Sequence, residues 1–171
     1  MKKLKVLFFL ILILPSIGYT QEKPSTMATI VNLIKARKNE FADIKGALFT
    51  ANKENNTEYY QGKQSFGAKT EALIYEKDKN RSRFLSYFDY NDTAELLKAT
   101  AIIDDVIKTI NIIAGNGPNS VYKSYDYKTT DGDDVTEITD NDNGFLVMQI
   151  TSGKKYNAFS LVIFGALYGK P

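Results

Sequence analysis

The residues from Thr129 to Phe145, TTDGDDVTEITDNDNGF, include five aspartates, and carboxylate oxygens are the ligands that calcium prefers. An EF-hand loop needs acids or amides at three alternating positions, then a glycine, and then a glutamate further along the chain. Here Gly144 takes the place of the third ligand, and residues 145–149 contain no glutamate. The stretch therefore does not encode an EF-hand.

Two tight turns are the better interpretation of this stretch. Asp131-Gly132 and Asn143-Gly144 each lie between alternating segments, and such pairs favour hairpin turns because they tolerate positive φ angles. A weak, irregular calcium site is the alternative. Its candidate ligands are Asp131, Asp133, Asp140 and Asp142.

The chain contains no histidine, cysteine or tryptophan. These absences exclude Ser-His-Asp and Cys-His catalysis, imidazole general bases, disulfides and nearly all zinc sites. Carboxylate chemistry remains, but a glycoside hydrolase of this type needs two carboxylates in a deep cleft. We therefore predict a protein that is not an enzyme, with no catalytic residue, no cofactor and no metal site. A carboxylate-based hydrolase is the rival class.

Tyrosine and basic side chains are the other groups that could bind a partner. Several of the eleven tyrosines fall on predicted strands, where tyrosine can anchor a protein contact or stack on a sugar, although it is also a common strand residue. Lys77, Lys79, Arg81 and Arg83 cluster at one predicted hairpin, which we interpret as a solvated turn. We expect no nucleic-acid partner.

The elements that must position these groups follow from hydrophobic periodicity. In the first half, steps of three and four predict a helix from Thr26 to Asp43, capped by Ser25 or Thr26 and stopped by Gly46. A strand over Tyr59–Ser65 and a hairpin formed by Thr70–Glu76 and Arg81–Tyr90 follow.

The second half begins with a helix that Asp92 and Glu95 start as a capping box and that runs to about Ala114. This helix is so apolar that we expect it to be mostly covered. The sequence GNGPN over residues 115–119 ends it. The four strands predicted after it are Val121–Lys128, Asp134–Thr139, Phe145–Thr151 and Tyr156–Phe164.

These elements predict an α+β fold in which two helices pack on one face of a mostly antiparallel sheet of six to eight strands. In each half of the chain the predicted elements begin with a helix, followed by a strand and a hairpin. This order is consistent with a tandem repeat. The layout resembles that of tandem helix-plus-antiparallel-sheet proteins, among them secreted inhibitors of β-lactamase and some secretion chaperones. The residues contain no family motif that would extend this resemblance to a function.

Alternation also predicts which side chains are buried. We expect Leu146, Met148 and Ile150 to form the core with Phe159, Leu161 and Ile163. The other sheet face is also apolar, which indicates an interaction surface, unless the sheet curls over itself or residues 165–171 fold across it. The predicted interaction face comprises Leu73, Tyr75, Leu85, Tyr87, Val147 and Val162.

The N-terminus has the pattern of a cleavable signal peptide over residues 1–20. Basic MKKLK precedes the apolar run Val6–Leu14, which is shorter than the roughly 20 residues of a membrane span and is followed by Pro15. The signal contains Lys2, Lys3 and Lys5, so the remaining chain is close to neutral.

We therefore expect one domain over residues 21–171, in the bacterial periplasm or secreted, with no membrane association after cleavage. The expected function is non-catalytic binding of a protein partner, or self-association as a homodimer, through the apolar, tyrosine-rich face. A module that binds a sugar or an apolar small molecule is the alternative.

Overall fold

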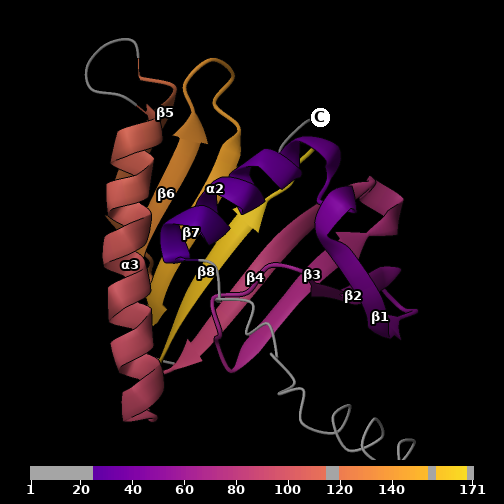
Figure 1. Cartoon of the computed structure of the whole chain (residues 1–171), viewed down its shortest axis with the longest axis horizontal. Coiled ribbons are helices and arrows are strands. Elements are labelled where there is room, and N and C mark those ends of the chain that lie inside the picture. Colours follow the sequence, from indigo (N-terminus) through magenta and orange to yellow (C-terminus); the bar gives the residue numbers. More distant parts are fainter. Residues whose placement is uncertain (1–24, 115–119, 154–156, 169–171) are drawn as a thin grey trace, which may run out of the picture.

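The computed structural model describes residues 25–114, 120–153 and 157–168, and Figure 1 shows their arrangement. Two α-helices pack on one face of a single eight-stranded antiparallel sheet, which confirms the predicted α+β class. The predicted signal peptide and the GNGPN stretch lie outside the described residues. None of the helices in the described part of the chain has the length and hydropathy needed to cross a membrane.

The sheet consists of two four-stranded meanders joined side by side. Its strand order is β1-β2-β3-β4-β8-β7-β6-β5, so the last strand of each half meets the other at the centre. The strands are β1 (Lys45–Asn52), β2 (Thr57–Gly62), β3 (Thr70–Glu76), β4 (Arg81–Asp89), β5 (Tyr122–Lys128), β6 (Asp134–Asp140), β7 (Leu146–Gly153) and β8 (Ala158–Phe164). Each half is one helix followed by four strands, although a common origin of the halves stays a prediction.

Strand β1 was not predicted, and the bounds of several other strands differ from the prediction. β1 is an edge strand, and Leu48 and Phe49 are adjacent residues that are both more than half exposed, so no alternation marks it. β2 covers Thr57–Gly62 rather than Tyr59–Ser65, and β7 continues through Gly153. The extra strand gives the two halves the same number of strands.

Helix α2 (Thr26–Ala36) begins where predicted and ends earlier. The hydroxyl of Ser25 accepts a hydrogen bond from the Ala28 N–H at 3.2 Å, which satisfies one of the free donors of the first turn. The prediction that the helix reaches Asp43 is wrong, because Glu40 and Phe41 adopt left-handed φ angles of 55° and 60°. Gly46 belongs to β1 rather than to a helix stop.

Helix α3 (Thr93–Ala114) has the predicted cap at Asp92, whose carboxylate accepts from the N–H groups of Ala94 at 2.9 Å and Glu95 at 3.3 Å. The Glu95 carboxylate accepts from the Lys69 N–H at 3.0 Å, so it fixes the β2–β3 loop. The expectation that α3 is mostly covered is wrong. Leu97 and Ile112 are 68% and 67% exposed, because α3 lies along one end of the sheet with its outer side uncovered in the described structure (Figure 1).

The core lies between the two helices and the sheet face beneath them. Five of the six predicted core residues, Met148, Ile150, Phe159, Leu161 and Ile163, belong to it, whereas Leu146 is only half-buried. They pack with Ile30, Leu33, Phe84, Phe88 and Val106, all fully buried.

The turn after α2 holds the C-terminal end of β8 through two charged residues, buried Arg37 and half-buried Glu40. Arg37 is buried, and its Nε donates to the Phe164 carbonyl at 2.8 Å. The Glu40 carboxylate accepts from the Ser82 N–H at 2.8 Å and from the Leu167 N–H at 2.7 Å. Burial lowers the pKa of Arg37, and the hydrogen bonds to backbone groups stand in for the lost water. We call this arrangement the Arg37–Glu40 clasp.

The clasp requires a glycine at position 165. A Cβ added there would lie 2.0 Å from the Glu40 carboxylate oxygen Oε2, so Gly165→Ala must displace the carboxylate that holds Ser82 and Leu167. We predict that this variant loses about 1–3 kcal/mol of unfolding free energy in denaturant titrations. The matched control is Gly153→Ala, whose Cβ meets its nearest atom at an ordinary 3.5 Å. Equal stability of the two variants would contradict this account of the clasp.

Candidate functional site

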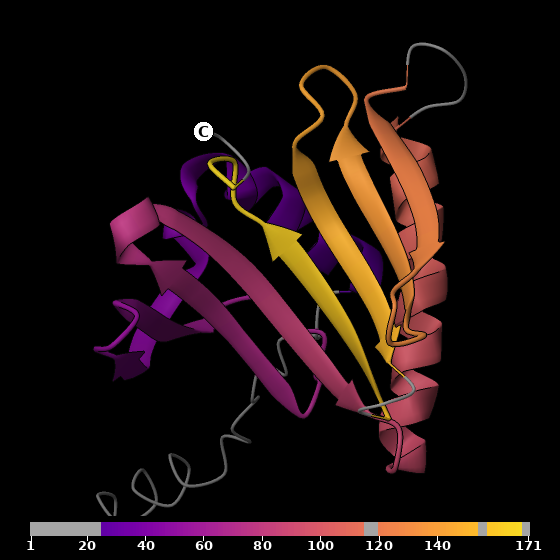
Figure 2. The same cartoon turned by 180° about the vertical axis from the view of Figure 1, so that it is seen from behind.

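The face of the sheet opposite the helices, which we call the open face, is the candidate functional surface. Figure 2 shows this face from behind, and neither α2 nor α3 crosses in front of it. Side chains alternate between the two faces along each strand, so on β4 Phe84 and Phe88 enter the core while Leu85 and Tyr87 point to the open face.

The structure divides the predicted interaction face into separate groups. Leu85 pairs with Val162 across β4 and β8, so these two residues and Tyr87 share the open face. Leu73 instead pairs with Phe84 and is 1% exposed in the core, so its assignment to the interaction face is wrong.

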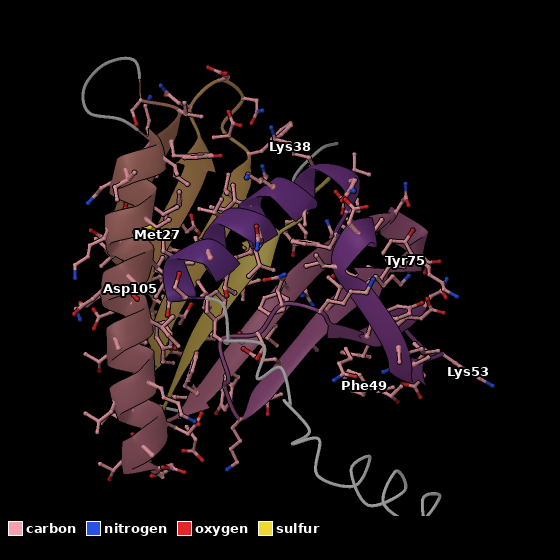
Figure 3. The ribbon with its side chains drawn as sticks, in the orientation of Figure 1. Met27, Lys38, Phe49, Lys53, Tyr75 and Asp105 are labelled. Carbon is pink, nitrogen blue, oxygen red and sulfur yellow. The ribbon has the colours of Figure 1, made fainter. Side chains whose placement is uncertain are left out.

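Tyr75 also lies on the opposite side from Leu85, two residues beyond Leu73 on β3. Figure 3 shows it close to the β1–β2 hairpin, on the side of the sheet that bears the helices. The Lys45 ammonium lies 5.1 Å from the Tyr75 ring centroid and 3.8 Å from that of Tyr60. Tyr75 and Leu73 line a hollow of about 270 Å³ there, separate from the open face.

Val147 belongs to the open face by alternation, but it is fully buried and cannot contact a partner directly. Part of this face is covered by the C-terminal segment. The Tyr168 ring packs on Phe164 with centroids 4.3 Å apart, and the Arg81 guanidinium lies 4.4 Å from the centre of the same ring. The alternative that residues 165–171 fold across this face thus holds for Tyr168, at one end of it.

A depression of about 340 Å³ remains on the open face over the central strands β4, β8 and β7, next to the turn between β5 and β6. We call it the central depression, and its lining residues are Leu85, Tyr87, Asp133, Thr151, Gly153, Ala158 and Ser160. Tyr87, Ser160 and Thr151 stand side by side on neighbouring strands β4, β8 and β7, so three hydroxyl-bearing side chains form one row. Gly153 and Ala158 pair in the next row, where their small size leaves room above the sheet.

Asp133 reaches this depression from the turn between β5 and β6. The turn is closed by a hydrogen bond from the Thr129 N–H to the Asp133 carbonyl at 2.9 Å, and Gly132 supplies the positive φ angle of 85° that it needs. The carboxylate oxygen Oδ1 of Asp133 lies 3.5 Å from the position that a Cβ on Gly153 would occupy. This oxygen is buried and has no hydrogen-bond partner among the described residues.

A larger hollow, about 530 Å³, lies on the helix side between α3 and strands β5–β7, with Ile103, Ile150 and Phe159 among its lining residues. It also has two carboxylates. Asp126 accepts a hydrogen bond from the Thr136 hydroxyl at 2.6 Å, and Asp134 is ion-paired with Lys128. Both carboxylates are exposed, whereas the general acid of a glycosidase needs an apolar setting that keeps its proton.

The basic side chains of the hairpin between β3 and β4 form ion pairs with acidic residues of the fold. Glu76 is ion-paired with Lys79, Arg81 and Arg83, and Lys77 is paired with Glu58 at 2.5 Å. Burial raises the pKa of Glu76, but hydrogen bonds from Arg81 and the charges of both arginines outweigh this effect, so the pKa lies below its usual value. Each of the four basic side chains of the hairpin is therefore paired with a carboxylate of the fold.

Asp133 was considered only as a turn residue or a calcium ligand in the sequence, and its place beside Gly153 and Ala158 was not predicted. The sequence signal for the depression is the presence of two small residues, Gly153 and Ala158, at paired positions of neighbouring strands. Comparisons of the chain with models of known protein families, with curated proteins and with solved structures found no match.

The assignment of β3 and β4 side chains to the two faces of the sheet can be tested by comparing the stability of two leucine variants. Leu73→Ala removes a side chain from the closed core, so we predict a loss of about 2–5 kcal/mol of unfolding free energy. Leu85→Ala is expected to lose less than about 1 kcal/mol, because this side chain is partly in contact with water already. Denaturant titrations measure both values, and similar losses would contradict the assignment of the two faces.

The proposed calcium ligands lie too far apart to share an ion. Asp131 and Asp133 precede β6, whereas Asp140 is its last residue and Asp142 follows it. Six strand residues, roughly 20 Å, therefore separate Asp133 from Asp140. The described residues contain no group of three or more acidic side chains placed to hold a metal. We predict that adding calcium leaves the melting temperature unchanged, and a clear rise would reveal binding.

Proposed function

We propose that this protein is a non-catalytic binding protein that acts outside the bacterial cytoplasm and holds a small ligand in the central depression. The observation that carries the proposal is the combination of an uncovered sheet face and a hollow of about 340 Å³ at its centre. Ligand pockets of small-molecule binding proteins start at about this size and combine apolar walls with a few polar groups. Export is the expectation drawn from residues 1–20.

Small-ligand binding fits the open face better than docking of a large partner. The apolar residues expected to form a continuous patch are interrupted, since Val147 is buried and Tyr168 packs over Phe164. Leu85 remains as an apolar wall, next to the aromatic ring of Tyr87 and the hydroxyls of Ser160 and Thr151. A protein interface of ordinary strength needs roughly 800 Å² per partner with an apolar centre. The central depression offers a compact, mixed surface instead.

The proposal that the protein is not a catalyst is supported by the exposure and the partners of the carboxylates in the two hollows. A hydrolase would need one protonated and one ionised carboxylate on either side of a bond. Asp126 and Asp134, in the hollow beside α3, are exposed and engaged with Thr136 and Lys128. Asp133 is the one carboxylate among the described lining residues of the central depression, whereas such a hydrolase uses two.

The test fills the depression. Ser160→Phe places a large ring at its centre, and Ser124→Phe is the matched control on the exposed strand β5. Backbone amide NMR spectra are recorded while amines, amino acids, sugars and organic acids are added to each protein. We predict saturable shifts of the Thr151, Gly153 and Ser160 amides in the wild type and in Ser124→Phe, and none in Ser160→Phe.

Two results would contradict the proposal. Ligand-induced shifts that persist in Ser160→Phe would place the binding site elsewhere. A wild-type dimer in light scattering that Ser160→Phe converts to a monomer would show that the open face contacts a second copy of the chain, as the sequence first suggested. Melting temperatures of both variants within a few degrees of the wild type confirm that the substitutions leave the fold intact.

A further inference from the structure

The Asp133 carboxylate leaves one buried acceptor unpaired. An ionised carboxylate can accept hydrogen bonds at both oxygens, and native proteins pair nearly all of their buried polar atoms. Oδ1 of Asp133 is buried above Gly153 without a partner in the described structure, although the backbone of the same residue is fully used in its turn. A ligand that brings a hydrogen-bond donor would satisfy this oxygen.

The charge of the depression points to a cationic donor. Asp133 is the single charged side chain among the described lining residues. Among the described residues on or beside the neighbouring strands, Arg83 binds Glu76 at 2.9 Å and Lys69 binds Asp89 at 3.3 Å, so both of these cations have other partners. A negative charge in a partly dehydrated hollow attracts a positive ligand more strongly than it would in water.

The groups around Asp133 match an ammonium head better than a larger planar cation. A primary ammonium has three N–H donors, and the depression offers the carboxylate together with the paired hydroxyls of Ser160 and Thr151. The Tyr87 ring stands in the same row and can stabilise a cation over its face. Leu85 provides an apolar wall for a short alkyl chain.

We propose that the central depression binds primary ammonium compounds, with the ammonium on Asp133 and the hydroxyl row and the carbon chain against Leu85. This inference rests on the proposed function and names the class of ligand for the same site. Neutral ligands such as sugars would leave the charge of Asp133 uncompensated, so they are expected to bind more weakly.

The experiment compares three probes on the full folded chain at neutral pH and moderate ionic strength. Butylammonium chloride carries the proposed head group, 1-butanol has the same carbon chain without the charge, and methyl glucoside represents a sugar. Amide NMR titrations follow Thr151, Gly153 and Ser160. We expect butylammonium to bind about tenfold or more tightly than butanol, the usual effect of a charged hydrogen-bonding partner.

Asp133→Asn removes the charge and keeps the shape of the side chain. It is expected to lower the affinity for butylammonium to that for butanol. Asp131→Asn, an exposed aspartate in the same turn, is the matched control and should change the affinity less than about twofold, because exposed charges are screened.

The remaining outcomes separate the two proposals. If methyl glucoside or butanol binds at these amides as tightly as butylammonium, or if Asp133→Asn leaves the butylammonium affinity unchanged, the ligand class is wrong and the binding site stands. If neither these probes nor the wider panel of amines, sugars and acids shifts these amides in the wild type, both the ligand class and the proposed function are overturned.

Discussion

The antiparallel pairing of β4 with β8 is the interaction on which the rest of the structure depends. Seven residue pairs, from Arg83 with Phe164 to Asp89 with Ala158, join the two meanders into one sheet. Without this seam each half would present a four-stranded sheet with an unpaired edge next to its largest apolar side chains. Because alternate residues point to opposite faces, the same ladder that sends Phe84 and Phe159 into the core also sends Leu85 and Ser160 into the central depression.

The Arg37–Glu40 clasp defines how much of the open face is left uncovered. By holding the carbonyl of Phe164 and the N–H of Leu167, it sets the direction in which the chain leaves β8. That direction brings Tyr168 over Phe164, where the Arg83 guanidinium donates to its hydroxyl at 3.3 Å. The end of the open face near β3 is therefore occupied, whereas the central depression stays uncovered. Arg37 and Glu40, which lie on the helix side of the sheet, thus affect the surface on the other side.

Elements with strong local signals were predictable from the sequence, and those fixed by distant contacts were not. The cap at Asp92 and the glycine turns at positions 132 and 144 depend on neighbouring residues, so pattern and chemistry identified them. The end of α2 depends on left-handed Glu40 and Phe41, which no local pattern announces because their partners lie on β4 and beyond β8.

The faces of β3 were misassigned for a related reason. Ala72, Leu73 and Ile74 are consecutive apolar residues, all buried, so alternation gives no indication of which one faces the helices. Only the register with Phe84 decides that Leu73 does. Prediction of the candidate site is limited in the same way, because part of it depends on contacts between distant segments. Leu85, Tyr87 and Val162 were identified as exposed strand residues, whereas Asp133 reaches the depression through a turn that the sequence marks without giving its direction.

The two outer strands determine how this sheet ends. β1 has register shifts between Lys45 and Leu48 and between Leu48 and Thr50. β5 carries three charged residues, Lys123, Asp126 and Lys128, along its exposed length. Irregular or charged borders are poor templates for main-chain pairing with a neighbouring molecule. Extension of the sheet from chain to chain into filaments is therefore disfavoured at both borders, even though each has hydrogen-bonding groups of its backbone open to solvent.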